Sequence, residues 1–108
     1  MRYLVTLESI DDGGMTPPKE TAALIENAVI PSLKALAEME KGGKLKGGVM
    51  AGRRGVAMIM DADSNEALSD TLRLLPLWGM AELDIVPLES FEHRIQADGQ
   101  AAQMMKNM

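Results

Sequence analysis

The sequence predicts an α+β fold whose strands and helices follow one another in the order β-α-β-β-α-β. Three observations lead to this prediction. Residues 56–60, Val-Ala-Met-Ile-Met, are apolar at both parities, which is typical of a strand covered on two faces. Leu68, Leu72 and Leu75 then recur at i, i+4 and i+7 and mark one face of an amphipathic helix. Residues 81–88 alternate, so the second half of the chain reads as a strand, a helix and a strand.

The first strand is predicted over residues 2–8, because its side chains alternate between two faces. One face carries Tyr3, Val5 and Leu7, and the other carries Leu4 and Thr6. Residues 11–15 favour a loop, since Asp-Asp-Gly-Gly is rich in turn-forming residues.

A long helix is predicted next, with Thr16 as its cap and Pro17 at its first position. Pro31 interrupts this helix. A proline inside a helix loses a hydrogen bond and clashes with the preceding turn, at about 3 kcal/mol or more, so we expect a kink or a bulge there. Gly42 and Gly43 end the helix.

A second strand is predicted over residues 44–50, where Gly47 and Gly48 favour a bulge or the close approach of a ligand or a neighbouring backbone. The second helix has Asp63 or Ser64 as its predicted cap.

This order of elements is the ferredoxin-like arrangement, an antiparallel sheet with two helices on one face. Its other face has no cover within the chain. Because residues 56–60 are apolar on both sides, a second copy of the same sheet is the simplest cover, which predicts a dimeric α+β barrel. We expect one domain over residues 1–92, followed by a C-terminal tail, 93–108, that is helical or docked on a neighbouring subunit. Three methionines of the tail are candidates for that contact: Met104, Met105 and Met108.

Composition narrows the classes of function. The chain has 108 residues, no cysteine and a formal net charge of −5, which excludes disulfides and cysteine-bound zinc and argues against nucleic-acid binding. His93 is the single histidine, so neither a metal site nor any other cofactor is expected. No apolar run is long enough for a signal peptide or a membrane span, and we predict a cytoplasmic protein.

Three segments carry a resemblance to a known family: D-A-D-S-N-E-A-L at 61–68, L-R-L-L-P-L-W-G-M at 72–80 and E-L-D-I-V-P-L at 82–88. They resemble the second half of the muconolactone isomerase family. The resemblance implies a dimeric α+β barrel that assembles into larger rings. It also implies an isomerase that shifts a carbon–carbon double bond by moving a proton on an unsaturated lactone. At residues 44–49 the chain has K-L-K-G-G-V, where the family carries an aromatic and basic run.

Glu82 and Asp84 are the candidate catalytic residues. They alternate with Leu83 and Ile85, so if those two face the helices, both acids point toward the barrel interior or the dimer seam. Proton abstraction next to a carbonyl needs a base of raised pKa, and a half-apolar cavity raises the pKa of a carboxylic acid. The alternative is that the two acids protect an edge strand against aggregation or pair with basic side chains across the interface.

Seven further residues are candidates for substrate binding. Lys46, Arg53 and Arg54 would hold or stabilise an anion, unless they belong to a solvated turn. Four further candidates are an indole that caps the cavity or packs a helix end, two hydroxyls and a proton shuttle: Trp78, Tyr3, Thr6 and His93.

Three functions remain open from the sequence. The first is a cofactor-free isomerase acting on a lactone or a related carbonyl compound. The second is a cofactor-free monooxygenase-type tailoring enzyme of the same barrel fold. The third is a non-catalytic homo-oligomer that binds a ligand or only assembles, which the loss of the aromatic and basic run favours. Fold alone does not choose among them.

Overall fold

A computed structural model describes residues 1–10 and 17–108 of the chain. Four strands form one antiparallel sheet in the order β2-β3-β1-β4, so β1 and β3 are central and β2 and β4 are the edges. The strands are β1 (Arg2–Ser9), β2 (Leu45–Val49), β3 (Gly55–Asp61) and β4 (Ala81–Leu88). The predicted α+β fold and its ferredoxin-like order are confirmed.

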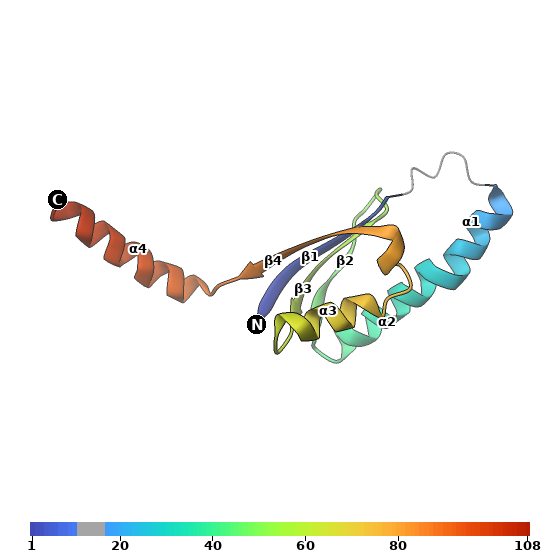
Figure 1. Ribbon diagram of the computed structural model, residues 1–108, viewed down its shortest axis with the longest axis horizontal. Coiled ribbons are helices and arrows are strands. Elements are labelled where there is room, and N and C mark those ends of the chain that lie inside the picture. The colour runs from blue at the N-terminus through green and yellow to red at the C-terminus, as the bar shows by residue number, and fades with distance from the viewer. Residues whose placement is uncertain (11–16) are drawn as a thin grey trace.

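The first helical segment runs from residue 18 to 41 without a break (Figure 1). It consists of α1 (Pro18–Leu24), a π-helical turn η1 (Ile25–Val29) and α2 (Ile30–Lys41). The π-helical turn ends at Val29, two residues before Pro31, where a kink or a bulge was expected. Proline has no N–H to donate to the preceding turn, and a π-turn absorbs the misfit by widening the helix locally. Thr16, the predicted cap, lies outside the described residues.

The second helix, α3 (Asn65–Arg73), begins where the sequence predicts. The hydroxyl of Ser64 accepts a hydrogen bond from the backbone N–H of Ala67 at 3.0 Å, so Ser64 rather than Asp63 is the cap. After the helix, a short 3-10 turn η2 (Trp78–Met80) leads into β4.

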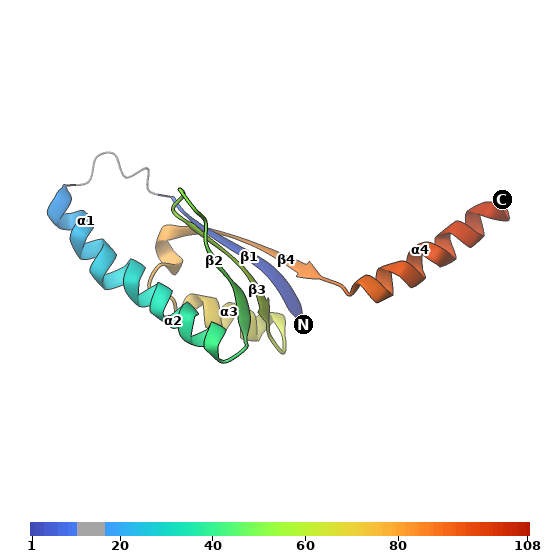
Figure 2. The same ribbon diagram turned by 180° about the vertical axis from the view of Figure 1, so that it is seen from behind.

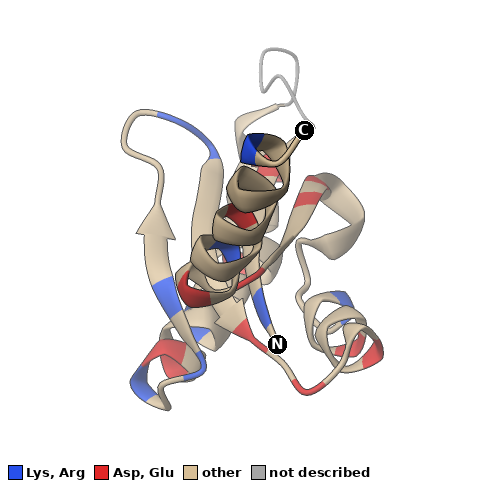
Figure 3. Cartoon of the chain, turned by 90° about the vertical axis from the view of Figure 1, so that its left-hand side faces the viewer, with Lys and Arg blue, Asp and Glu red and all other residues tan. Residues whose placement is uncertain are grey.

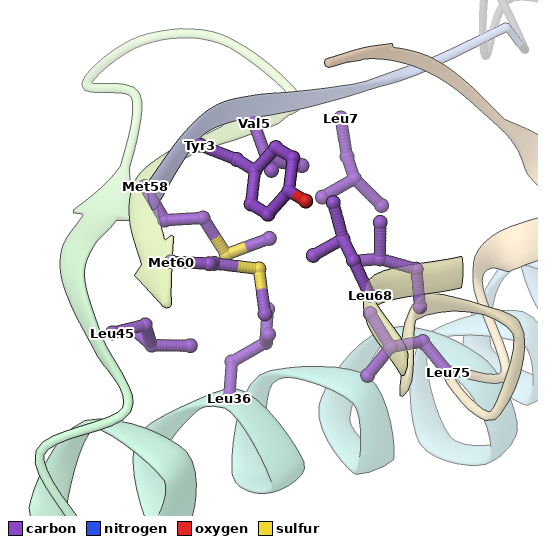
Figure 4. Packing of buried hydrophobic residues seen from close by; sticks show 10 residues of the cluster. Tyr3, Val5, Leu7, Leu36, Leu45, Met58, Met60, Leu68 and Leu75 are labelled. Atoms are coloured by element: carbon purple, nitrogen blue, oxygen red, sulfur yellow. The ribbon is translucent and has the colours of Figure 1, made fainter. Parts of the chain in front are cut away.

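The core lies between the sheet and the two helices α2 and α3, which cover the same face (Figures 1 and 2). Figure 4 shows the side chains of β1 and β3 meeting those of the helices. Tyr3, Val5 and Leu7 are at most 4% exposed, as their alternation predicts. The rest of the buried cluster is aliphatic and methionine-rich: Leu36, Leu45, Met58, Met60, Leu68, Leu72 and Leu75.

The C-terminal segment is a helix, α4 (Phe91–Lys106), which begins two residues before the tail predicted from the sequence. It follows the end of β4 and points away from the domain (Figure 1). Among the described residues, no helix is long and apolar enough to cross a membrane.

Candidate functional site

The sheet face opposite the helices carries both candidate acids. Leu83 is partly buried on the helix side of β4, so Glu82 and Asp84 project from the other face, as predicted. Asp84 lies directly opposite Thr6 of β1, and Glu82 lies opposite Glu8. Both acids are exposed in the single chain.

Side chains on this open face form rows across the strands. The row of Asp84 contains Thr6, Ala57 and Gly48, and it is therefore made of small side chains. The next row toward the N-terminus of β1 is bulkier and mostly apolar: Lys46, Ile59, Leu4 and Val86. On the other side of Asp84 lies the row of Glu82, Glu8 and Gly55. The candidate base Asp84 therefore lies at the end of a row of small side chains. An apolar row lies on one side of this row, and a charged row lies on the other.

Arg53 reaches the charged row from the turn between β2 and β3. Its guanidinium contacts the carboxylate of Glu8 at 2.5 Å. Glu8 and Glu82 are like charges in directly opposite positions, an unfavourable arrangement that a nearby cation relieves. The structure thus brings Arg53 and Glu82 to the same end of the sheet.

Lys46 projects from the same face but at its other edge. It lies on β2, and β3 and β1 stand between it and the acids of β4. With strands about 4.8 Å apart, three steps separate its backbone from β4 by about 14 Å. Lys46 is therefore not a neighbour of Glu82 or Asp84 within one chain.

A cavity of about 540 Å³ lies on the helix side of the sheet, at the end where β1 finishes and β4 begins. Arg53 and Arg54 line it together with mainly apolar residues from the long helix and the strand ends, among them Leu24, Ile25 and Met80. The two arginines of the predicted anion site thus stand beside an apolar chamber, and Arg53 also contacts Glu8 on the open face.

Tyr3 and Trp78 line a different hollow, a groove of about 650 Å³ between α3 and β4. The hydroxyl of Tyr3 donates a hydrogen bond to the side-chain oxygen of Asn65, at 2.5 Å. The guanidinium of Arg73 lies 5.2 Å from the ring centre of Trp78, so the indole is a half-exposed wall with a cation over it. Neither aromatic residue shares a face with the acids.

His93 lies in the first turn of α4, away from the open sheet face, the cavity and the groove. Its Nε2 is 3.8 Å from a carboxylate oxygen of Glu89, and its side chain is exposed. Within the described residues, no three His, Asp or Glu side chains gather closely enough to hold a metal ion.

Glu8 and Asn65 were not among the residues predicted for the site. Glu8 shares the parity of Thr6 on the first strand, a signal that was available, but its partner Arg53 is 45 residues away. Asn65 looked like an ordinary residue in the first turn of a helix, and only the packing of α3 on β1 brings its amide to Tyr3.

The chain resembles known proteins in sequence and in fold. A family model described as muconolactone delta-isomerase matches residues 1–94. The chain belongs to this family. No curated protein sequence matches the chain significantly.

Two solved structures share the fold of this muconolactone isomerase family member. A crystal structure of muconolactone isomerase is 23% identical in sequence, with a TM-score of 0.65, and the match covers 83% of this chain and 90% of that one. A 5-chloro-2-hydroxyhydroquinone dehydrochlorinase from Burkholderia phenoliruptrix, in complex with 2,5-dihydroxybenzoquinone, is 18% identical with a TM-score of 0.60. That match covers 86% of this chain and 98% of the dehydrochlorinase. Most of α4 lies beyond the residues that the family model matches.

Proposed function

We propose that this muconolactone isomerase family protein is an enzyme that moves a proton along the skeleton of an unsaturated lactone or a related carbonyl compound, with Glu82 or Asp84 as the base. The observation that carries the proposal is the position of the two acids. They lie two residues apart on the one sheet face that no helix covers. Thr6 lies opposite Asp84, and the Arg53 guanidinium contacts Glu8, which lies opposite Glu82.

The chemistry needs one base and one group that stabilises negative charge. A carboxylate removes a proton from the carbon next to the carbonyl, and the electron pair moves into an enolate. The same carboxylic acid then returns the proton to a different carbon, so the double bond shifts while the overall composition of the substrate stays the same. In this proposal Thr6, which lies opposite Asp84, donates a hydrogen bond to the oxygen of the enolate, and Arg53, which contacts Glu8, supplies positive charge.

Enclosure of the acids requires a second chain. In the single chain both carboxylates are exposed to water. A second sheet packed on the open face would remove that water from the row of small side chains. The proposed active unit is therefore a dimer in which the acids face the seam.

The test is proton NMR of muconolactone and its unsaturated isomer incubated with the protein in deuterated water. The unmodified protein is expected to incorporate deuterium and interconvert the isomers. Glu82→Gln and Asp84→Asn are made separately, and the variant that removes the base should slow exchange by about 100-fold or more. The other variant should have a smaller effect, which identifies the base.

Glu38→Gln is the matched control, because Glu38 is an exposed acid on α2, in the helix layer rather than on the open sheet face. Its exchange rate should equal that of the unmodified protein. The proposal is wrong if no exchange occurs at high protein concentration. It is also wrong if both open-face variants keep the full rate.

A further inference from the structure

The helix-side cavity that Arg53 and Arg54 line has the size and the character of a small-molecule site. Its volume of about 540 Å³ falls within the range of about 300–1,000 Å³ that is usual for ligand pockets. Such pockets are mostly apolar and contain a few polar groups that orient the ligand. This cavity follows that pattern. Among the described residues that line it, the polar side chains are two hydroxyls and two guanidinium groups: Ser9, Thr21, Arg53 and Arg54.

The long helix forms one wall of this cavity. Its lining residues begin at Thr21 and end at Leu33, and a helix covers about 18 Å between those two positions. Ile25 and Val29, which also line the wall, are the first and last residues of the π-helical turn η1. Turns of this kind occur frequently at functional sites. The wall is therefore long and mainly apolar, and it contains the one irregular turn of the helix.

Backbone hydrogen bonds hold the other walls of the cavity in place. The N–H of Ser9 donates to the carbonyl oxygen of Arg54 at 3.0 Å, which joins the end of β1 to the turn between β2 and β3. The N–H of Ile10 donates to the carbonyl oxygen of Met80 at 3.3 Å, which joins the chain after β1 to η2. All four residues line the cavity. The cavity is therefore formed before any ligand binds, as is usual for small-molecule sites.

The charge at the cavity is positive. Among the described residues, no Asp or Glu side chain lines it. Figure 3 shows the turn between β2 and β3 at the upper left, with a blue basic stretch and no red on the turn itself. The guanidinium of Arg53 is held by Glu8 on the open sheet face. Arg54 is exposed and forms no ion pair with any other described residue. On a chain with a net charge of −5, this cavity is thus a local site for an anion.

We propose that this cavity binds a carboxylate that has an apolar chain or ring. The carboxylate lies at the exposed guanidinium of Arg54, because the paired N–H groups of arginine match the two oxygens of a carboxylate. The apolar part follows the long helix toward the half-buried side chains of Leu33 and Leu77. This site does not depend on the proposed function, since it uses neither Glu82 nor Asp84 and lies on the helix side of the sheet.

Isothermal titration calorimetry of the full chain with octanoate tests the proposal. Two probes with the same chain and a different head group are the controls, octan-1-ol and octylammonium. Octanoate should bind about tenfold more tightly than octan-1-ol, because the alcohol lacks the charge-assisted contact to the guanidinium. Octylammonium should bind most weakly, since its positive charge is repelled by the arginines.

Substitutions separate the two parts of the site. Arg54→Gln should raise the dissociation constant of octanoate about tenfold and leave that of octan-1-ol unchanged. Arg73→Gln is the matched control, because Arg73 lies over Trp78 and does not line the cavity. Ile25→Gln should weaken the binding of both probes, because it makes the apolar wall polar. Ile25 is 42% exposed, so this substitution leaves the buried core intact.

Methyl NMR of the unmodified protein locates the bound octanoate. The methyl signals of Leu24, Ile25 and Met80, which line the cavity, should shift. Those of Leu68 and Ile85, which line the groove between α3 and β4, should stay in place.

Three results would overturn the proposal. The first is that octanoate does not bind, which includes the case in which a neighbouring chain fills the cavity. The second is that the three probes bind equally, because the arginines would then contribute nothing. The third is that Arg54→Gln and Arg73→Gln weaken the binding of octanoate to the same extent.

Discussion

At the scale of single residues, two adjacent glycines of β2 have different roles. The pairing of β2 with β3 is regular from residue 45 to 49, so the bulge considered for this strand does not form. A Cβ on Gly47 would lie 2.3 Å from the carbonyl oxygen of Ala57 and 2.6 Å from Cα of Met58, whereas a Cβ on Gly48 would meet nothing within 4 Å. Gly47 therefore permits close packing against β3, and Gly48 contributes no side chain to the row that contains Asp84.

Substitution of the two glycines should separate these roles. Gly47→Ala should destabilise the fold by about 1–3 kcal/mol, because the added methyl group forces backbone or core side chains to move. Gly48→Ala should change the free energy of unfolding by less than about 0.5 kcal/mol. Urea denaturation of both variants measures the difference, and equal losses of stability would contradict it.

At the scale of elements, a single buried hydroxyl joins the two halves of the helix layer. Ser32, on α2, is 1% exposed, and its Oγ accepts a hydrogen bond from the backbone N–H of Leu77 at 3.0 Å. Leu77 precedes η2, which leads into β4 and its acids. The contact therefore links the long helix to the segment that positions the last strand.

Ser32→Ala should cost about 1–3 kcal/mol, because the N–H of Leu77 loses its partner at a part-buried site. Ser69→Ala is the control: Ser69 is an exposed serine of α3, and its loss should change stability by no more than about 0.5 kcal/mol. Thermal and urea denaturation report both values. If the two serines proved equivalent, the hydrogen bond would not contribute as the structure indicates.

At the scale of the whole molecule, the single chain leaves two apolar surfaces without cover. One is the open sheet face, where Leu4, Ile59 and Val86 are 37–41% exposed. The other lies on α4, where Phe91, Ile95 and Met104 are 68–91% exposed. A domain of this size gains much of its stability from burying such surfaces. The two surfaces lie on different elements, so each can be tested separately.

Ile59→Glu should weaken the pairing of two sheets, because it places an unpaired carboxylate in the middle of the seam. We expect the dissociation constant of the dimer to rise by about 100-fold or more. Ile30→Glu is the control, since Ile30 is equally exposed, at 40%, but lies on the long helix. Sedimentation velocity over a range of concentrations measures both; an unchanged association in Ile59→Glu would place the dimer contact elsewhere.

Local patterns in the sequence determined the elements and their faces. The alternation of Tyr3, Val5 and Leu7 and the spacing of the α3 leucines each act over a few residues, and both predictions are confirmed. The cap of α3 was predicted as Asp63 or Ser64, and the structure selects Ser64. The parity of Glu82 and Asp84 followed in the same way, because strand geometry alone sends alternate side chains to opposite faces.

Only the tertiary structure decided which candidate residues lie together. The β2-β3-β1-β4 order keeps Lys46 away from the acids, while the β2–β3 turn brings Arg53 to Glu8. The fold also places Tyr3 and Trp78 on the opposite side of the sheet from the acids, and His93 lies outside the domain on α4. These relations join residues distant along the chain, so they depend on packing that no local pattern contains.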